Sequence, residues 1–147
     1  MSSPTITAAL IISRTAALQD RSAELYRQLA ARFSEHAEDL LAFAGRCERN
    51  KVQIVRTYQE TVSDALETGF AFAGLSLPDP LATDAVAQAV DWPTAARGAI
   101  ALEEQAIAFY SQVAEACESL LATIPGAYRR VIKTRKKRIE GLKSMVS

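Results

Sequence analysis

The chain has 147 residues, of which 49% are hydrophobic and 23% are charged, and its 17 basic residues balance its 17 acidic ones. A chain of this length and apolar content buries a core as one globular domain over residues 1–147, which excludes a disordered protein. The balanced charge excludes a protein whose whole surface is built to bind phosphate or anionic lipid, so any basic site must be local.

The apolar segments bear on where the protein resides. No apolar run approaches the roughly 20 residues that a membrane-spanning helix needs. The first basic residue is Arg14, so the amino-terminal residues lack the positive segment of a secretory signal peptide. We therefore expect a cytoplasmic protein that has no membrane partner.

Two long helices are predicted in the first half of the chain. Apolar residues recur at steps of three and four over residues 5–33, which is the pattern of an amphipathic helix. A second stripe of this kind runs over residues 41–62 and fades near Gly69. The connection between the two helices is short, so residues 1–69 are predicted to form an antiparallel helical hairpin.

A crossover and a second hairpin are predicted next. Residues 70–92 form the crossover, because their Leu-Ser-Leu-Pro-Asp-Pro segment cannot continue a helix and only residues 81–90 could form a short one. A third helix then ends at Pro125-Gly126, and a fourth begins at about Ala127. These two helices make residues 93–147 the second hairpin.

The predicted fold is all-α, since nothing in the sequence indicates a strand. Two antiparallel hairpins joined by a long crossover have the topology of the ferritin-like four-helix bundle. An internal repeat supports a duplicated hairpin, because residues 17–30 and 101–114 are identical at five matched positions. Tyr26 and Tyr110 are one of these matches, which sets the separation at 84 residues.

The segment Leu-Glu-Glu-Gln-Ala-Ile-Ala-Phe-Tyr at residues 102–110 places Glu103 seven residues before Tyr110. This segment resembles the metal-binding helix of rubrerythrin-like proteins in the ferritin-like superfamily, and the resemblance extends over most of the chain. It implies that each hairpin supplies one Glu from its first helix and an E-x-x-H pair from its second, which together bind two irons in the core. The resemblance also implies a homodimer.

This sequence departs from the family's ligand pattern at almost every position. The six positions that correspond to the ligands are Gln19, Glu48, Lys51, Glu103, Ile132 and Arg135. Glu103 is retained, and the apolar residues three, four and seven positions away predict that it faces the core. A register two residues later would instead place Asn50 and Gln53 on the second helix. Both registers lack a histidine ligand, so we expect no metal and no other cofactor.

Opposite charges replace the metal in the predicted core. The hypothesis groups two anions with two cations on inward faces, namely Glu48, Glu103, Lys51 and Arg135. Such a compensated network is tolerable, whereas any one of these charges buried alone would cost several kcal/mol. Alternatively, Lys51 extends outward to solvent and Glu48 lies at the edge of the bundle. Tyr26 and Tyr110 are interpreted as core aromatic residues beside this site.

The strongest charge signal is a run of seven cations within residues 129–138. Its candidate surface residues for a protein partner are Arg129, Arg130, Lys133, Lys136 and Lys137. The neutral chain and the lack of aromatic residues among these cations argue against specific nucleic-acid binding. A charged outer helix face is also the ordinary solution for a bundle.

The sequence therefore predicts a noncatalytic bundle that has lost its di-iron centre and acts as a binding or assembly module. The alternative is a non-haem iron oxidoreductase that uses a reduced ligand set around Glu48 and Glu103. A third hypothesis is an adaptor in a larger assembly, with the basic last helix as its contact. No catalytic residue is predicted, because a Gly-rich phosphate loop is missing and the single His leaves no Ser or Cys relay.

Overall fold

The computed structural model of the protein describes residues 8–61, 83–117 and 123–146. Its elements in chain order are α1 (Ala8–Arg32), the short 3-10 helix η1 (Ser34–His36), α2 (Ala37–Thr61), α4 (Asp84–Ala87), α5 (Trp92–Cys117) and α6 (Thr123–Ser144). Within the described ranges every element is helical, which confirms the all-α prediction.

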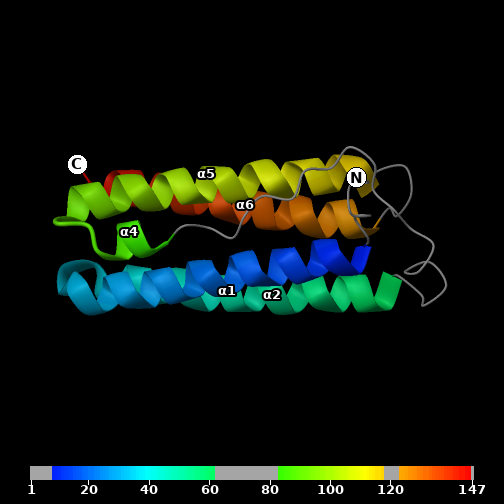
Figure 1. The fold of residues 1–147 in the computed structure, drawn as a ribbon, viewed down its shortest axis with the longest axis horizontal. Helices are drawn as coiled ribbons and strands as arrows, with labels where there is room; N and C mark the ends of the chain where they lie inside the picture. The colour runs from blue at the N-terminus through cyan, green and yellow to red at the C-terminus, as the bar shows by residue number, and fades with distance from the viewer. Residues whose placement is uncertain (1–7, 62–82, 118–122, 147) are drawn as a thin grey trace, which may run out of the picture.

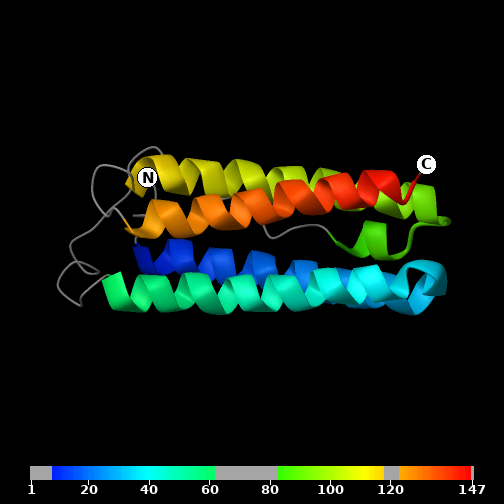
Figure 2. The ribbon, with the colours of Figure 1, turned by 180° about the vertical axis from the view of Figure 1, so that it is seen from behind.

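The four long helices lie side by side along one direction (Figure 1). Helix α1 packs against α2 and α5 packs against α6, each pair running antiparallel, while α2 also contacts α6 and α1 also contacts α5. Figure 2, the view from behind, shows α2 and α6 next to each other. Each long helix therefore has two long neighbours, and the four enclose a common core.

Helix α2 ends and α5 begins at opposite ends of this arrangement (Figure 1). The predicted crossover at 70–92 requires the two helix ends to be placed in this way. Residues 62–82 lie outside the described residues, and α4 falls within the short helix predicted at 81–90. Helix α4 contacts α1 and α5.

The α4 end of the molecule is closed by aromatic stacking. The indole of Trp92 stacks on His36 with ring centroids 4.3 Å apart, and it meets the edge of Phe33 at 5.4 Å. Its Nε1 donates a hydrogen bond to the carbonyl oxygen of Met145, 3.0 Å away. Arg32 donates to the carbonyl oxygen of Ala89 at 2.6 Å, which ties the segment after α4 to α1.

The start of α6 differs from the prediction. Helix α6 begins at Thr123, four residues before the predicted Ala127. Pro125 lies in the first turn, where a missing N–H removes no intrahelical hydrogen bond. The Pro-Gly pair therefore opens the last helix and does not separate it from the third.

Burial in α1 and α5 follows the 84-residue repeat. The buried pairs at this separation are Ile11 and Ala95, Thr15 and Ala99, Leu18 and Leu102, Gln19 and Glu103, Ser22 and Ala106, Leu25 and Phe109, Tyr26 and Tyr110, Leu29 and Val113, and Ala30 and Ala114. The two helices thus present the same positions to the core, and the Gln19 and Glu103 positions are polar in both.

Helices α2 and α6 correspond at a separation of 88 residues. The buried pairs are Leu40 and Tyr128, Ala44 and Ile132, Cys47 and Arg135, Asn50 and Arg138, and Ile54 and Leu142. The connection in the second hairpin is therefore four residues longer than in the first. This difference corrects the sequence alignment, because the counterpart of Arg135 in α2 is Cys47 and not Lys51.

Candidate functional site

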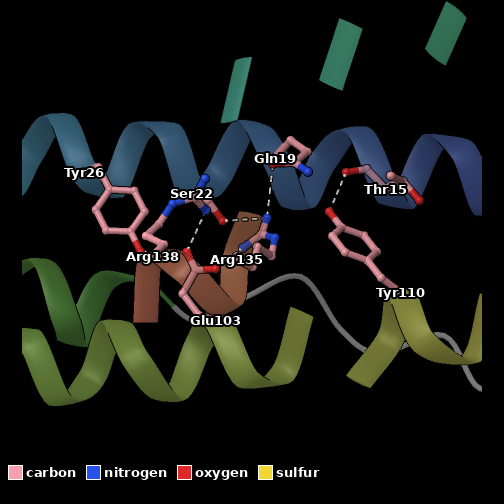
Figure 3. Close-up of polar contacts among 8 residues, drawn as sticks. All are labelled: Thr15, Gln19, Ser22, Tyr26, Glu103, Tyr110, Arg135 and Arg138. Carbon is pink, nitrogen blue, oxygen red and sulfur yellow. Dashed lines mark hydrogen bonds and ion pairs between the residues drawn. The ribbon is translucent and has the colours of Figure 1, made fainter. Parts of the chain in front are cut away.

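Glu103 lies at the centre of the core, on α5, with 2% of its surface exposed. Its Oε2 accepts a hydrogen bond from Nη1 of Arg135 at 2.8 Å (Figure 3). Its Oε1 accepts one from Nη1 of Arg138 at 3.0 Å and one from the hydroxyl of Tyr26 at 2.6 Å. Both carboxylate oxygens are therefore engaged by charged or hydroxyl donors from α6 and α1.

Arg135 connects this carboxylate to α1. The side chain is fully buried, and its Nη2 donates to Oε1 of Gln19 at 3.2 Å and to Oγ of Ser22 at 3.3 Å (Figure 3). Its guanidinium also lies over the ring of Tyr110, 5.2 Å from the centroid. A planar guanidinium suits this position because its fixed fork can satisfy several acceptors while one face contacts an aromatic ring.

Arg138 brings a second cation to the same carboxylate. Its guanidinium lies 5.7 Å from the ring centroid of Tyr26 and 5.8 Å from that of Phe43. We call the set formed by Gln19, Ser22, Tyr26, Glu103, Arg135 and Arg138 the buried cluster. Two guanidinium groups and one carboxylate give this cluster a formal charge of about +1, so aromatic faces supply part of the stabilisation of the cations.

A second polar contact lies further along the core. The hydroxyl groups of Thr15 and Tyr128 share a hydrogen bond of 2.5 Å, and Thr15 Oγ1 also donates to the carbonyl oxygen of Ile11 at 2.9 Å. The hydroxyl of Tyr110 approaches the carbonyl oxygen of Thr15 at 3.5 Å (Figure 3). Buried hydroxyl groups thus find partners on neighbouring helices, as burial requires.

The electrostatics of the buried cluster favour an ionised Glu103. Burial acts to raise the pKa of its carboxyl, but attraction to Arg135 and Arg138 and the hydrogen bond from Tyr26 hold that pKa below its ordinary value. Burial acts to lower the pKa of Arg135, and the Glu103 charge reverses this and raises it. The cluster is therefore a salt bridge of one anion with two cations at neutral pH.

Three other buried groups keep their protons in the folded protein. Burial raises the pKa of the Tyr26 hydroxyl well above its usual range, and the neighbouring Glu103 charge raises it further. Burial also raises the pKa of Tyr110 and that of the Cys47 thiol, against the opposing attraction of nearby arginines. Ionising these groups in the folded state is thus unfavourable.

We expect the protein to lose stability in alkali. Groups whose folded pKa is raised contribute stability that is complete below their unfolded pKa, near 8.5 for Cys and 10 for Tyr, and is lost as the pH rises above it. Urea unfolding should show a lower free energy of unfolding at pH 10.5 than at pH 8. Cys47→Ala should reduce this slope, and an unchanged stability over that range would contradict the assigned shifts.

Among the residues that the structure describes, four buried side-chain nitrogen atoms have no hydrogen-bond partner. They are Nε2 of Gln19, Nδ2 of Asn50, Nε of Arg135 and Nη2 of Arg138. All four are donors, which agrees with an environment that holds more N–H groups and more positive charge than acceptors.

The buried cluster does not fit a divalent metal. Its one carboxylate is already bound by two cations, and the remaining side-chain nitrogens in it donate hydrogen bonds and cannot ligate. Iron needs several carboxylate and imidazole ligands. Among the residues that the structure describes, no three His, Cys, Asp or Glu side chains come together as a metal site.

The structure separates two predicted members from this core. The Glu48 side chain is 56% exposed and pairs with Arg27 of α1, and the Lys51 ammonium lies 2.9 Å from a carboxylate oxygen of Asp20. The prediction that Glu48 and Lys51 join Glu103 and Arg135 is therefore wrong. The alternative, in which Lys51 extends outward and Glu48 lies at the edge, agrees with the structure.

The prediction for Glu48 and Lys51 failed because the inward positions of α2 lie one residue earlier in the sequence than predicted. Cys47 and Asn50 are buried at the level of the cluster, so the residues that follow each of them point away from the core. The alternative register placed Asn50 and Gln53 at the ligand positions, and in the structure Asn50 is buried whereas Gln53 is exposed. Ile132 is buried in α6 as an apolar core residue.

Sequence reasoning missed two members of the cluster, Ser22 and Arg138. A signal for Arg138 exists, because it lies three residues after Arg135 and is flanked by Ile139 and the buried Leu142 on the same stripe. Ser22 lies three residues after Gln19 on α1. Each missed residue therefore lies three residues after a polar residue that the sequence alignment had already placed at a ligand position.

The predicted basic surface lies on the outside of α6. All five of its residues, Arg129, Arg130, Lys133, Lys136 and Lys137, are exposed. The three lysines of this set line a shallow groove of about 570 Å³ beside α5, together with the apolar side chains of Ile107 and Ile139. This groove also contains Glu104 and Glu140, so its charge is mixed.

Comparison with known proteins returned no protein-family profile, curated protein or solved structure that matches this chain. The residues described contain no helix that is both long and apolar enough to cross a membrane.

Proposed function

We propose that this protein is a noncatalytic ferritin-like, rubrerythrin-like bundle that has lost its di-iron centre and acts as a binding or assembly module. The observation that carries the proposal is the salt bridge of Glu103 with Arg135 and Arg138 in the middle of the four long helices. In this proposal, guanidinium groups replace the metal ions as the cations that hold the core carboxylate.

The positions of the cluster residues support this interpretation. Gln19 and Glu103 lie on the first helix of each hairpin, where the resembling family has its single Glu. Arg135 and Arg138 stand three residues apart on the fourth helix, which is the spacing of the E-x-x-H pair, and in this proposal they take the place of the Ile132 and Arg135 pair that the sequence alignment assigned. Cys47 and Asn50 are the corresponding pair on α2. The ligand positions would therefore have been kept as inward sites while their chemistry changed.

The alternative proposal is an iron-binding oxidoreductase with a reduced ligand set. One observation favours it, namely the inward carboxylate of Glu103. It also needs Glu48, which lies exposed on the outer side of α2 and pairs with Arg27. A metal site would then require both a rearranged α2 and the release of two arginines from Glu103, so we favour the noncatalytic function.

A module without chemistry in its core acts through its surface. We propose that its partners are proteins, with a second copy of the chain as the first of them. The basic residues of α6 provide a second candidate surface for an acidic protein partner, because complementary charge steers association.

Ferrous iron oxidation tests the noncatalytic proposal. We expect the protein, mixed with excess ferrous iron in aerobic buffer, to leave the oxidation rate within about twofold of buffer alone, because the buried cluster offers no free ligand. Glu103→Gln, assayed at a temperature where circular dichroism shows that it is folded, removes the one core carboxylate and should give the same rate. A protein-dependent acceleration that Glu103→Gln abolishes would contradict the proposal and support the oxidoreductase.

A further inference from the structure

The outer face of α2 carries exposed apolar side chains in a regular pattern. Of the large apolar residues that the described part of the chain exposes, Leu41 at 54% and Val52 at 53% both lie on this helix. We call the stripe formed by Leu41, Gly45, Glu48, Arg49, Val52 and Arg56 the α2 face. Its members are three or four residues apart, with Glu48 and Arg49 adjacent at the centre, so they lie on one side of the helix, while the opposite side of α2 packs on α1 and α6.

A hollow lies in the middle of the α2 face. It has a volume of about 420 Å³ and is lined by Gly45, Glu48, Arg49, Val52 and Gln53. Gly45 contributes no side chain to this hollow. A Cβ atom at Gly45 would meet only the guanidinium of Arg49, at 3.5 Å, which is an ordinary contact with the mobile end of a long side chain. The position can therefore receive a side chain from outside.

The α2 face is complementary to itself when two copies run antiparallel. A two-fold axis between residues 48 and 49 places Val52 of one copy opposite Gly45 of the other. The same axis places Glu48 opposite Arg49, twice, and Leu41 opposite the aliphatic part of Arg56. One register thus fills the hollow with an apolar knob and pairs both central charges.

We propose that the α2 face is a self-association surface, in which α2 packs antiparallel on α2 of a second copy with Val52 inserted over Gly45. This inference rests on the proposed function as an assembly module with a second copy as its partner, and it specifies the surface and register of the pairing. The pairing is isologous, so it closes as a dimer and does not propagate into a filament. One helix pair is a small interface, and we expect micromolar affinity.

A charge-exchange experiment tests the pairing by analytical ultracentrifugation over a micromolar concentration series. The wild type should shift from monomer to dimer as its concentration rises. Glu48→Arg makes both central residues cationic and Arg49→Glu makes both anionic, so each variant alone should weaken the dimer at least tenfold. An equimolar mixture of the two variants restores opposite charges across the axis and should form a heterodimer of near wild-type affinity.

Shape complementarity is tested separately. Gly45→Leu fills the hollow and should abolish the dimer, while circular dichroism and thermal melting should show that the monomer remains folded. Val90→Glu is the matched control, because Val90 is 88% exposed and lies outside the α2 face. It should leave the association unchanged. The Glu48→Arg variant of the charge-exchange experiment also loses the surface salt bridge between Glu48 and Arg27, and this loss should have little effect on the fold.

Three results would overturn the pairing. These are a wild type that stays monomeric at every concentration, a dimer that Gly45→Leu leaves intact, and charge variants that fail to associate when mixed. None of these results depends on the iron assay. The noncatalytic proposal can therefore hold if self-association through the α2 face is wrong, and self-association can hold if the noncatalytic proposal is wrong.

Discussion

Replacing Glu103 with glutamine should lower the free energy of unfolding by about 3–5 kcal/mol. The substitution keeps the shape of the side chain but removes the one anion that Arg135 and Arg138 share. Both guanidinium groups would then be buried without a counter-charge, which costs far more than the loss of a single hydrogen bond. Urea unfolding at neutral pH measures the difference.

The matched control for this substitution is Glu104→Gln. Glu104 is the next residue of α5 and is exposed, so its neutralisation should change stability by less than about 0.5 kcal/mol. If Glu103→Gln were as mild as Glu104→Gln, the buried cluster would not be the electrostatic centre of this core.

Arg135→Met should be the second most destabilising change, by about 2–4 kcal/mol. It leaves the acceptors on Gln19 and Ser22 without their donor, and it replaces a buried guanidinium with a shorter thioether that donates no hydrogen bond. The loss should be smaller than for Glu103→Gln, because Arg138 still neutralises the carboxylate. A larger loss of stability for Glu103→Gln than for Arg135→Met would therefore show that the buried cluster holds one more cation than anion.

The coupling between these residues can be measured with a double-mutant cycle. The variant with both Glu103→Gln and Arg135→Met should be more stable than the sum of the single effects predicts, by at least about 1 kcal/mol. The reason is that removing the cation relieves the penalty created by removing the anion. Additive effects would mean that the two side chains act independently despite their 2.8 Å contact.

The inward polar residues could be predicted where a helix has a clear apolar stripe. Glu103 has apolar residues three, four and seven positions away on both sides, so only one face of α5 can be buried. Arg135 lies on an equally clear stripe in α6, seven residues after the buried Tyr128 and seven before the buried Leu142. For Glu103 the periodicity alone predicts the direction of the side chain, whereas Arg135 is assigned inward by its match to a ligand position, and its stripe agrees with that assignment.

Prediction failed where the assignment depended on aligning one hairpin with the other. The separation of 84 residues holds for the first helix of each hairpin and becomes 88 for the second, because the connection lengths differ. The separation of 84 paired Lys51 with Arg135, and the predicted stripe admitted Glu48 and Lys51, although the buried positions of α2 are Cys47 and Asn50. A rotation of one residue about a helix, roughly 100°, is enough to exchange a core position for a surface one.

Arg138 could not be distinguished from its neighbours by residue type. It ends a run in which five cations are exposed and two are buried, and all of them are Lys or Arg. Only its three-residue step from Arg135 and the carboxylate that faces both of them separate it from the surface residues. Knowledge of the Glu103 position was needed before the second cation could be assigned.

Metal content tests the central claim most directly, which is that arginines and not iron hold the core carboxylate. Untagged protein would be loaded anaerobically with ferrous iron, exposed to air and desalted, and its iron measured by mass spectrometry. The salt bridge of Glu103 with Arg135 and Arg138 predicts essentially no retained iron and an unchanged near-ultraviolet spectrum. Iron near two equivalents per chain, with the absorption of an oxo-bridged pair, would contradict it.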